Sequence, residues 1–206
     1  MTGELSSGAH LTLEHSIECS RRLAAAAADA GFQPHVVVGV LEGGILPARI
    51  VATALDARLA VLRVRRPASS LKHSTMGRLL AKAISGLYDR LLIVRRLAEL
   101  ANRADRRSVQ VPPAAALRAG ESRVLVIDDS SESGITLRVA KGAMAGAASV
   151  DVRTAVITWL RGRRTTAIEP DFHLYECWLQ FPWSTNSPDY ARYMEWRRRH
   201  FTTEEN

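Results

Sequence analysis

The sequence predicts an α/β fold with a mainly parallel sheet, and three observations support this prediction. Residues 36–40 and 123–127 are short, apolar, largely β-branched runs, which are typical of strands buried on both faces. Stretches with helical periodicity follow each of these runs. Strands that alternate with helices favour a parallel sheet within a single domain, here residues 1–206.

In the first part of the chain, glycine, proline and apolar periodicity define the expected elements. A helix is expected over residues 11–30, because the alanine run at 24–28 favours helix and Gly31 stands where helices commonly end. After the strand at 36–40, Pro47 suits the first turn of a helix that ends near residue 55. Residues 60–64 are the next expected strand.

The second part repeats the pattern after an interruption. Residues 67–120, with a helical stretch at about 76–103, are expected to be a helical insertion or cap between the second and third core strands, because they are too short for a core of their own. The elements expected beyond it are a strand at 123–127, a polar loop at 128–134, a helix at 135–145, strands at 150–160 and 172–175, and a C-terminal hood at 171–206 that ends in a helix over 189–200.

Composition excludes several classes of protein. Hydrophobic residues make up 47% and charged residues 24% of the chain, which excludes a disordered protein. No apolar run approaches the ~20 residues that span a bilayer, and residues 1–10 lack the features of a signal peptide. Cys19 and Cys177 cannot form a disulfide scaffold and have no metal-ligand spacing. A reduced, cytoplasmic protein is therefore expected.

The chain is basic, with 28 Lys+Arg against 21 Asp+Glu and a net charge of +7. A positive balance indicates an anionic partner, which leaves nucleic acid, anionic membranes and small polyanions such as nucleotides or sugar phosphates open. Much of the excess comes from arginine clusters, which are equally well explained as solvated helix faces. They lie at residues 95–96, 106–107, 161–164 and 197–199.

The strongest functional signal comes directly after the strand expected at residues 123–127. Asp128 and Asp129 close that strand, and small residues then lead into a helix. Amides at a helix N-terminus favour an anion, Ser133 and Thr136 add hydroxyl donors, and Gly134 permits close approach. The carboxylates suit sugar hydroxyls or hydrated Mg²⁺. Together these groups predict a ribose 5-phosphate site; the alternative is that the two acids cap an ordinary helix.

This segment, residues 124–137, resembles the ribose-phosphate-binding motif of the type I phosphoribosyltransferases: an apolar strand, two acids and a small-residue loop that ends in Gly-x-Thr. Residues 36–48 resemble that family's pyrophosphate loop, and residues 178–183 resemble the base-binding end of its xanthine-guanine and archaeal hypoxanthine-guanine types. The resemblance covers most of the chain except residues 67–120. It implies the family's parallel sheet flanked by helices, with a helical insertion and a small C-terminal hood.

The resemblance also implies a reaction. In this family the donor is 5-phosphoribosyl 1-pyrophosphate (PRPP) with Mg²⁺, and a nitrogenous base displaces pyrophosphate at C1 of the ribose. Asp128 and Asp129 would hold the ribose hydroxyls, directly or through the metal, and Glu132 would be the general acid/base, where the family commonly has Asp. The donor-binding set implied by the match is Leu41, Glu42, Gly43, Gly44, Arg65, Ser130, Ser131, Ser133, Gly134, Ile135 and Thr136.

Base recognition is matched less closely. Trp178 and Leu179 would contact the edge of the base, although the alternative for this tail is a hydrophobic corner of the core. Arg161 stands where members that use 6-oxopurines have Lys, and its forked, permanent charge has a different geometry. Trp159 and Trp183 are further candidates for stacking on the ring.

Arg63 or Arg65, at the end of the second expected strand, could neutralise pyrophosphate as it leaves. The alternative for both arginines is ordinary surface charge. In the family as a whole, the peptide bond before the residue that matches Glu42 is often cis.

Two functional hypotheses follow. The favoured one is a Mg²⁺-dependent pentosyltransferase that acts on PRPP and a purine or purine-like base, and that forms a dimer or tetramer as type I enzymes commonly do. The alternative is a PRPP-sensing regulator of the same fold that binds nucleic acid. A base-binding end argues against a sensor of the donor alone. No membrane partner is expected, and nucleic acid is not the expected ligand.

Overall fold

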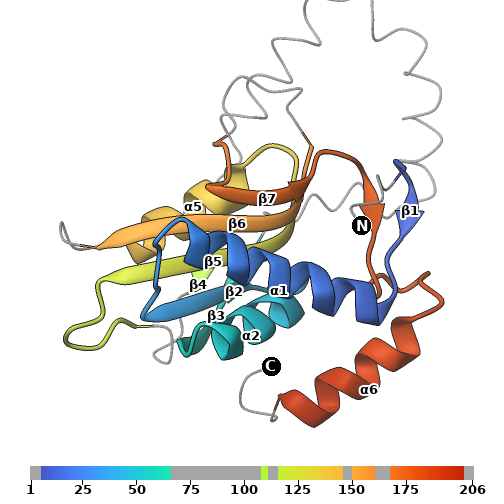
Figure 1. The fold of residues 1–206 in the computed structure, drawn as a ribbon, viewed down its shortest axis with the longest axis horizontal. Coiled ribbons are helices and arrows are strands. Elements are labelled where there is room, and N and C mark those ends of the chain that lie inside the picture. Colours follow the sequence, from blue (N-terminus) through green and yellow to red (C-terminus); the bar gives the residue numbers. More distant parts are fainter. Residues whose placement is uncertain (1–5, 66–107, 111–115, 146–149, 161–167, 202–206) are drawn as a thin grey trace, which may run out of the picture. The chain divides into compact units, whose positions relative to one another are not determined.

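The computed structural model describes residues 6–65, 108–110, 116–145, 150–160 and 168–201. Its core is a six-stranded sheet with the order β4-β3-β2-β5-β6-β7 (Figure 1). The neighbours from β3 to β7 all pair in parallel, which confirms the mainly parallel sheet. The strands are β2 (Val36–Val40), β3 (Arg58–Arg65), β4 (Ser108–Gln110), β5 (Arg123–Ser131), β6 (Asp151–Trp159) and β7 (Phe172–Tyr175).

Helices cover both faces of this sheet. α1 (Leu13–Asp29) and α2 (Ile45–Ala54) lie on one face, and α5 (Ile135–Met144) lies on the other (Figure 1). The central strands alternate between the two layers: Val37 packs toward α1 and α2, whereas Val36 and Val38 pack toward α5. Every residue of β2 is buried, because successive side chains of a strand point to opposite faces and both faces are covered.

The first expected helix is confirmed as α1, and capping interactions define both of its ends. It begins after Thr12, whose extended backbone and side-chain oxygen cap the helix by accepting from the His15 amide. It ends before Gly31, which has a φ of +68° and donates its amide to the Ala28 carbonyl. The expected start at residue 11 is therefore two residues early, because Leu11 pairs with Gln180 instead.

Strand β5 is longer than the sequence predicts. The polar run at 128–134 was expected to be a loop, but pairing with β6 continues through Ser131, which lies opposite Trp159. Backbone hydrogen bonds to β6 hold these residues in the strand although their side chains are polar. The loop between β5 and α5 is thus reduced to residues 132–134.

The predicted insertion lies mostly outside the described residues, including the helix expected at 76–103. Within residues 67–120, the described part contains the edge strand β4, which neighbours β3. A three-residue strand carries too short a pattern to be recognised from sequence. The chain divides into two compact units, residues 1–64 with 109–206, and residues 65–108.

The two ends of the first unit are joined to each other. Strand β8 (Leu179–Gln180) pairs in parallel with β1 (Ala9–His10), forming a separate two-stranded sheet. Helix α6 (Tyr190–His200) buries Tyr193 in a cluster with Leu13 and Leu46. Among the described residues, no helix is both long enough and apolar enough to cross a membrane.

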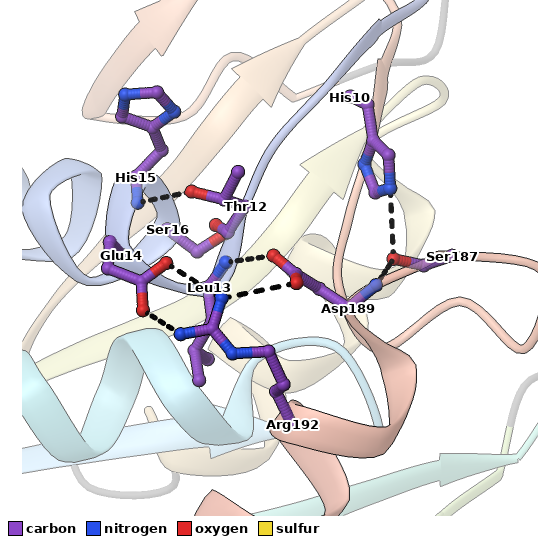
Figure 2. A network of polar contacts seen from close by, with 9 residues as sticks. All are labelled: His10, Thr12, Leu13, Glu14, His15, Ser16, Ser187, Asp189 and Arg192. Carbon is purple, nitrogen blue, oxygen red and sulfur yellow. Dashed lines mark hydrogen bonds and ion pairs between the residues drawn. The ribbon is translucent and has the colours of Figure 1, made fainter.

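A polar network fixes the start of α6 on the start of α1 (Figure 2). The Asp189 carboxylate accepts from the Leu13 amide at 2.9 Å, and Arg192 pairs with Glu14. On the other side, Ser187 Oγ lies 3.1 Å from His10 Nε2 and accepts from the Asp189 amide. Residues 10–14 and 187–192 are thereby held together.

Candidate active site

The carboxyl ends of β2 and β5 form the natural ligand-binding edge of the sheet. These parallel neighbours are in register from Val36 opposite Val124 to Gly39 opposite Ile127. The chain moves from β2 to β3 on one side and from β5 to β6 on the other. Ligands of open parallel sheets bind at such a reversal of strand order. The segments after β2 and at the end of β5 are the two that sequence analysis singled out.

The segment that follows β2, Leu41 to Gly44, packs tightly against β5. The Leu41–Glu42 peptide is cis, as the family resemblance implies. The Leu41 amide donates to the Leu62 carbonyl at 2.9 Å, and the Gly44 amide donates to the Val40 carbonyl at 2.8 Å. A Cβ at Gly44 would lie 2.3 Å from the Ile127 carbonyl oxygen. Glycine is required there so that the turn can approach β5.

Asp129 lies at the centre of this edge and is surrounded by protein. Its Oδ2 accepts from Trp183 Nε1 at 2.7 Å, and its Oδ1 accepts from Ser130 Oγ at 2.9 Å. A Cβ at Gly43 would lie 2.0 Å from Oδ2, so the glycine backbone packs directly on the carboxylate. Burial raises the pKa of the Asp129 carboxyl, and the hydrogen bonds from Trp183 and Ser130 oppose that rise only in part.

Asp128 is half-buried and belongs to the other face of the strand. Residues of a strand alternate, so Asp129 follows Leu125 and Ile127 toward the side of α1 and α2, which leaves Asp128 on the side of α5. Its Oδ1 accepts from the Asp129 amide at 2.9 Å. The two carboxylates are therefore adjacent in sequence but lie in different surroundings, on opposite faces of β5.

The turn between β5 and α5 depends on Gly134. This residue has a φ of +63°, and a Cβ on it would lie 2.5 Å from the Ile168 nitrogen. The first helical hydrogen bond of α5 runs from the Arg138 amide to the Gly134 carbonyl. The amides of residues 135–137 come before that bond, as expected at a helix N-terminus.

The side chains of this turn differ in exposure. Glu132 is exposed, whereas Ser133 and Thr136 are half-buried. Ser131 and Ile135 are buried, which places them in the framework of the turn. The Ser131 carbonyl accepts from the Leu160 amide at 2.8 Å, as part of the pairing with β6.

The predicted base-binding end lies on β8 and just before it. Trp178 is 52% exposed, and its carbonyl accepts from the Gly8 amide at 2.7 Å. Leu179 is buried in the main core, opposite Ala9. Arg161 lies outside the described residues; Arg65 ends β3, but its side chain also lies outside them.

Two tryptophans considered for stacking on a base are packed within the protein. Trp159 is 7% exposed and lies against Leu137 and Val156. Trp183 stacks on Phe181 with ring centroids 4.8 Å apart and planes 7° apart. The hydrophobic-corner alternative therefore describes Phe181, which is buried, and much of the Trp183 ring.

Sequence reasoning missed two contacts that join the C-terminal residues to this edge. One is the hydrogen bond from Trp183 to Asp129, and the other is an ion pair of 3.0 Å between Arg197 and Glu42. The partners of the ion pair are 155 positions apart. No periodicity or motif marks such distant pairs, although the Trp183 side chain was recognised as belonging near the site.

The donor set suits Mg²⁺ that arrives with a substrate. No group of three or more His, Cys, Asp and Glu side chains that could hold a metal occurs among the residues described. Mg²⁺ is commonly bound by one or two carboxylates, with water and substrate oxygens completing the shell. Asp128 and Asp129 offer one such carboxylate on each face of the end of β5, so one of them would bind the ion and water and substrate oxygens would complete its shell.

Comparison with known proteins agrees with this fold. The family profile described as "Phosphoribosyl transferase domain" matches residues 12–191. No curated protein sequence matches the chain. Among solved structures, the purine phosphoribosyltransferase of Pyrococcus horikoshii Ot3 is similar with a TM-score of 0.57 and 19% identity, over 86% of this chain and 94% of that one.

Two further structures have a similar fold. The Helicobacter pylori xanthine-guanine-hypoxanthine phosphoribosyltransferase gives a TM-score of 0.61 at 16% identity, over 91% of this chain and 99% of that one. A hypothetical protein from Neisseria gonorrhoeae with bound ppGpp gives 0.57 at 16% identity, over 95% and 100%. At these identities the likeness is one of fold.

Proposed function

The chain belongs to the phosphoribosyl transferase domain family, and from this premise we propose that it moves the 5-phosphoribosyl group of PRPP to a purine or purine-like base, with release of pyrophosphate. One observation carries the proposal: the loop after β2 and the end of β5 meet at the reversal of strand order, with Gly43 against Asp129. The resemblance of both segments to the family's donor-binding loops supports a donor site at this edge.

The start of α5 is assigned to the 5-phosphate of the donor. The amides of residues 135–137 precede the first helical bond, and the positive end of the helix dipole favours an anion there. The hydroxyls of Ser133 and Thr136 stand in the same turn. Ser130, Ser131, Gly134 and Ile135 complete the assigned set and shape the turn. Asp128, on the α5 side of the strand, is assigned to the ribose hydroxyls.

The loop after β2 is assigned to pyrophosphate. The amides of Glu42 and Gly43 are the proposed donors, because those of Leu41 and Gly44 already donate to backbone carbonyls. Arg65, or Arg63 on the same strand, is proposed to neutralise the leaving group as its charge develops. Asp129, directly beneath Gly43, stands between this loop and the ribose region.

Glu132 is the proposed general acid/base. A ring nitrogen of the base forms a bond to C1 of the ribose while the bond from C1 to the pyrophosphate oxygen breaks. The proton on the attacking nitrogen passes to the Glu132 carboxylate, whose side chain is exposed beside the site. Trp178 and Leu179 are proposed to contact the edge of the base largely through backbone groups, and Arg161 to meet a polar substituent on it.

Mg²⁺ is the proposed cofactor, with Asp128 and Asp129 as its candidate ligands, one on each face of β5, and donor oxygens to complete its shell. When bound, it supplies positive charge that neutralises the pyrophosphate of the donor. The residues of the protein have roles of their own that do not depend on the charge of the metal. The amides and hydroxyls are proposed to hold the donor at both ends, and the hydrogen bonds from Trp183 and Ser130 keep the Asp129 carboxylate in one orientation.

The alternative, a PRPP sensor that binds nucleic acid, is not favoured. It drew support from the basic balance of the chain and from the arginine clusters of the insertion, residues 95–96 and 106–107, which lie outside the described residues. Of the arginines at the end of α6, Arg197 pairs with Glu42 and Arg199 pairs with Glu195, so these two charges have acidic partners within the protein.

Donor binding tests the proposal. Isothermal titration of the full-length protein with PRPP and Mg²⁺ is expected to show saturable binding that Asp128→Asn weakens by about tenfold to a hundredfold. Glu195→Gln, on the exposed face of α6, is the matched control and is expected to bind as the wild type does. Absence of donor binding, together with salt-dependent binding of duplex DNA or RNA, would favour the alternative instead.

Two finer predictions accompany the proposal. A dimer or tetramer is expected from the family, and light scattering coupled to size-exclusion chromatography measures it. A reduced, cytoplasmic setting is expected for a protein whose two cysteines, Cys19 and Cys177, are free thiols.

A further inference from the structure

The C-terminal segment, defined here as residues 181–201, touches both donor loops from outside. Trp183 Nε1 donates to Asp129 Oδ2 at 2.7 Å, at the end of β5. Arg197 pairs with Glu42 at 3.0 Å, in the loop after β2. Neither contact belongs to the assigned donor-binding or base-binding set, yet each ends on a residue of that set.

The Trp183 ring, which makes the first contact, packs against two other aromatic side chains. The indole ring stacks on buried Phe181 and lies against Tyr193, with ring centroids 5.7 Å apart in the second pair. Indole has a single donor, and here that donor is directed at the Asp129 carboxylate. Hydrogen bonds to a charged acceptor are among the stronger ones in a protein. Together with Ser130, which bonds Oδ1, Trp183 therefore fixes where the Asp129 carboxylate points.

The arginine contact comes from an anchored helix. The start of α6 is tied to α1 through Asp189 and Leu13 (Figure 2), and Tyr193 is buried in the next turn. Arg197 follows one turn later with a side chain that is 18% exposed, whereas Glu42 is 65% exposed. The anchored, more buried Arg197 thus gives the exposed Glu42 side chain a fixed partner in the loop after β2.

We propose that Trp183 and Arg197 are positioning residues, through which the C-terminal segment holds Asp129 and Glu42 in the geometry that the donor requires before the donor binds. The inference rests on the proposed function, because the advantage concerns PRPP binding. A preformed site avoids the free-energy cost of ordering two loops when PRPP binds. It assigns a positioning role to residues of the C-terminal segment that lie outside the proposed donor-binding set.

The test compares conservative variants with matched controls in the full chain. Trp183→Phe removes the donor and keeps a ring on Phe181, with Trp196→Phe on the same aromatic cluster as control. Arg197→Gln removes the charge, Arg197→Lys is the rescue variant, and Arg198→Gln on the exposed face is the control. Amide hydrogen exchange without ligands and titration with PRPP and Mg²⁺ are measured for each.

The expected result is local. In Trp183→Phe, amides 41–44 and 128–131 exchange about tenfold faster than in the wild type, while amides of buried β6 are unchanged, and the donor Kd rises about tenfold. Arg197→Gln gives about a threefold effect confined to residues 41–44, because one partner is exposed, and Arg197→Lys restores most of it. Both controls behave as the wild type does.

Three results separate this inference from the proposed function. Unchanged exchange in both loops overturns the positioning roles, even if the protein binds PRPP. Faster exchange throughout the first unit, without an excess in these loops, shows a merely structural role and overturns them as well. A wild-type protein that does not bind PRPP contradicts the proposed function, whereas the exchange measurement still decides whether Trp183 and Arg197 order the loops.

Discussion

Gly43 and Asp129 lie so close together that a Cβ at residue 43 would stand 2.0 Å from the carboxylate oxygen Oδ2. This packing joins the loop after β2 to the end of β5. The two loops therefore form one unit, and a disturbance of either one is transmitted to the other.

Gly43→Ala is predicted to disrupt this unit. Its methyl group must displace a buried carboxylate or the loop itself, at a cost of about 1–3 kcal/mol in the free energy of unfolding. Donor affinity is expected to fall with it. The control is Gly142→Ala, where nothing lies within 4 Å of the added Cβ and the exposed helical site predicts a gain of about 0.5–1 kcal/mol. Urea denaturation of both variants measures the difference, and equal stability changes would contradict the packing argument.

Glu132→Gln is predicted to lower kcat by about 10²–10⁴-fold, because the amide cannot accept the proton of the base. Donor affinity is expected to remain within about twofold, since the Glu132 side chain is exposed and is not among the groups assigned to the phosphate. Steady-state kinetics and donor titration measure the two quantities separately. Glu132→Asp, which restores the residue common in the family, is the control that should retain activity. A kcat for Glu132→Gln equal to that of the wild type would remove the acid/base role.

Asp128→Asn and Asp129→Asn are predicted to differ in kind. Asp128 faces α5 and is half-buried, so its loss should weaken donor and Mg²⁺ binding without unfolding the protein. Asp129 is enclosed by Trp183, Ser130 and Gly43, so its replacement should also loosen those contacts. Thermal unfolding with and without PRPP distinguishes the two effects. Wild-type turnover in both variants would exclude the pair from the site.

Glu121 provides a pH-dependent contribution to stability away from the site. Hydrogen bonds from Arg58, at 2.7 and 2.6 Å, lower the pKa of the Glu121 carboxyl from 4.5 to about 2. Because the pKa is lower in the folded state, the contribution is present above about pH 4.5 and is lost as the pH falls toward 2. Glu121→Gln is expected to cost about 1–2 kcal/mol at neutral pH.

The expected signature is convergence at acid pH. Denaturation at pH 7, 4 and 3 should show the gap between Glu121→Gln and the wild type narrowing as the acid is protonated. A gap that stays constant over this range would show that the Arg58–Glu121 pair does not carry the titration.

Local sequence signals predicted the sheet well. Strand β2 and strand β7 were expected with the bounds observed, and α1, α2 and α5 within about two residues, because apolar runs, Gly31 and the small-residue turn before α5 are local features. The position of the site followed from the same features. Strands of a parallel sheet end at one edge, so the segments after 36–40 and 123–127 had to come together there.

These local signals could not predict strand pairing between residues that are distant in the sequence. Asp128 to Ser131 were expected in a loop, because their composition is polar, but the backbone of β6 keeps them in β5. The pairing of β1 with β8 involves two residues on each side, too few for any periodicity. Gly43 and Gly44 were expected to open amides to phosphate; the structure adds that each is needed for close packing on β5.

Turnover is the measurement that tests the central claim most directly. The wild-type protein is incubated with PRPP, Mg²⁺ and a pool of purine and purine-like bases, and new nucleotides are sought by mass spectrometry, with Asp128→Asn as the inactive control. The account predicts a nucleoside 5′-monophosphate and an equal amount of pyrophosphate, and the mass of the nucleotide identifies the base. PRPP that binds but is never consumed, with any base of the pool, would contradict the proposed transfer.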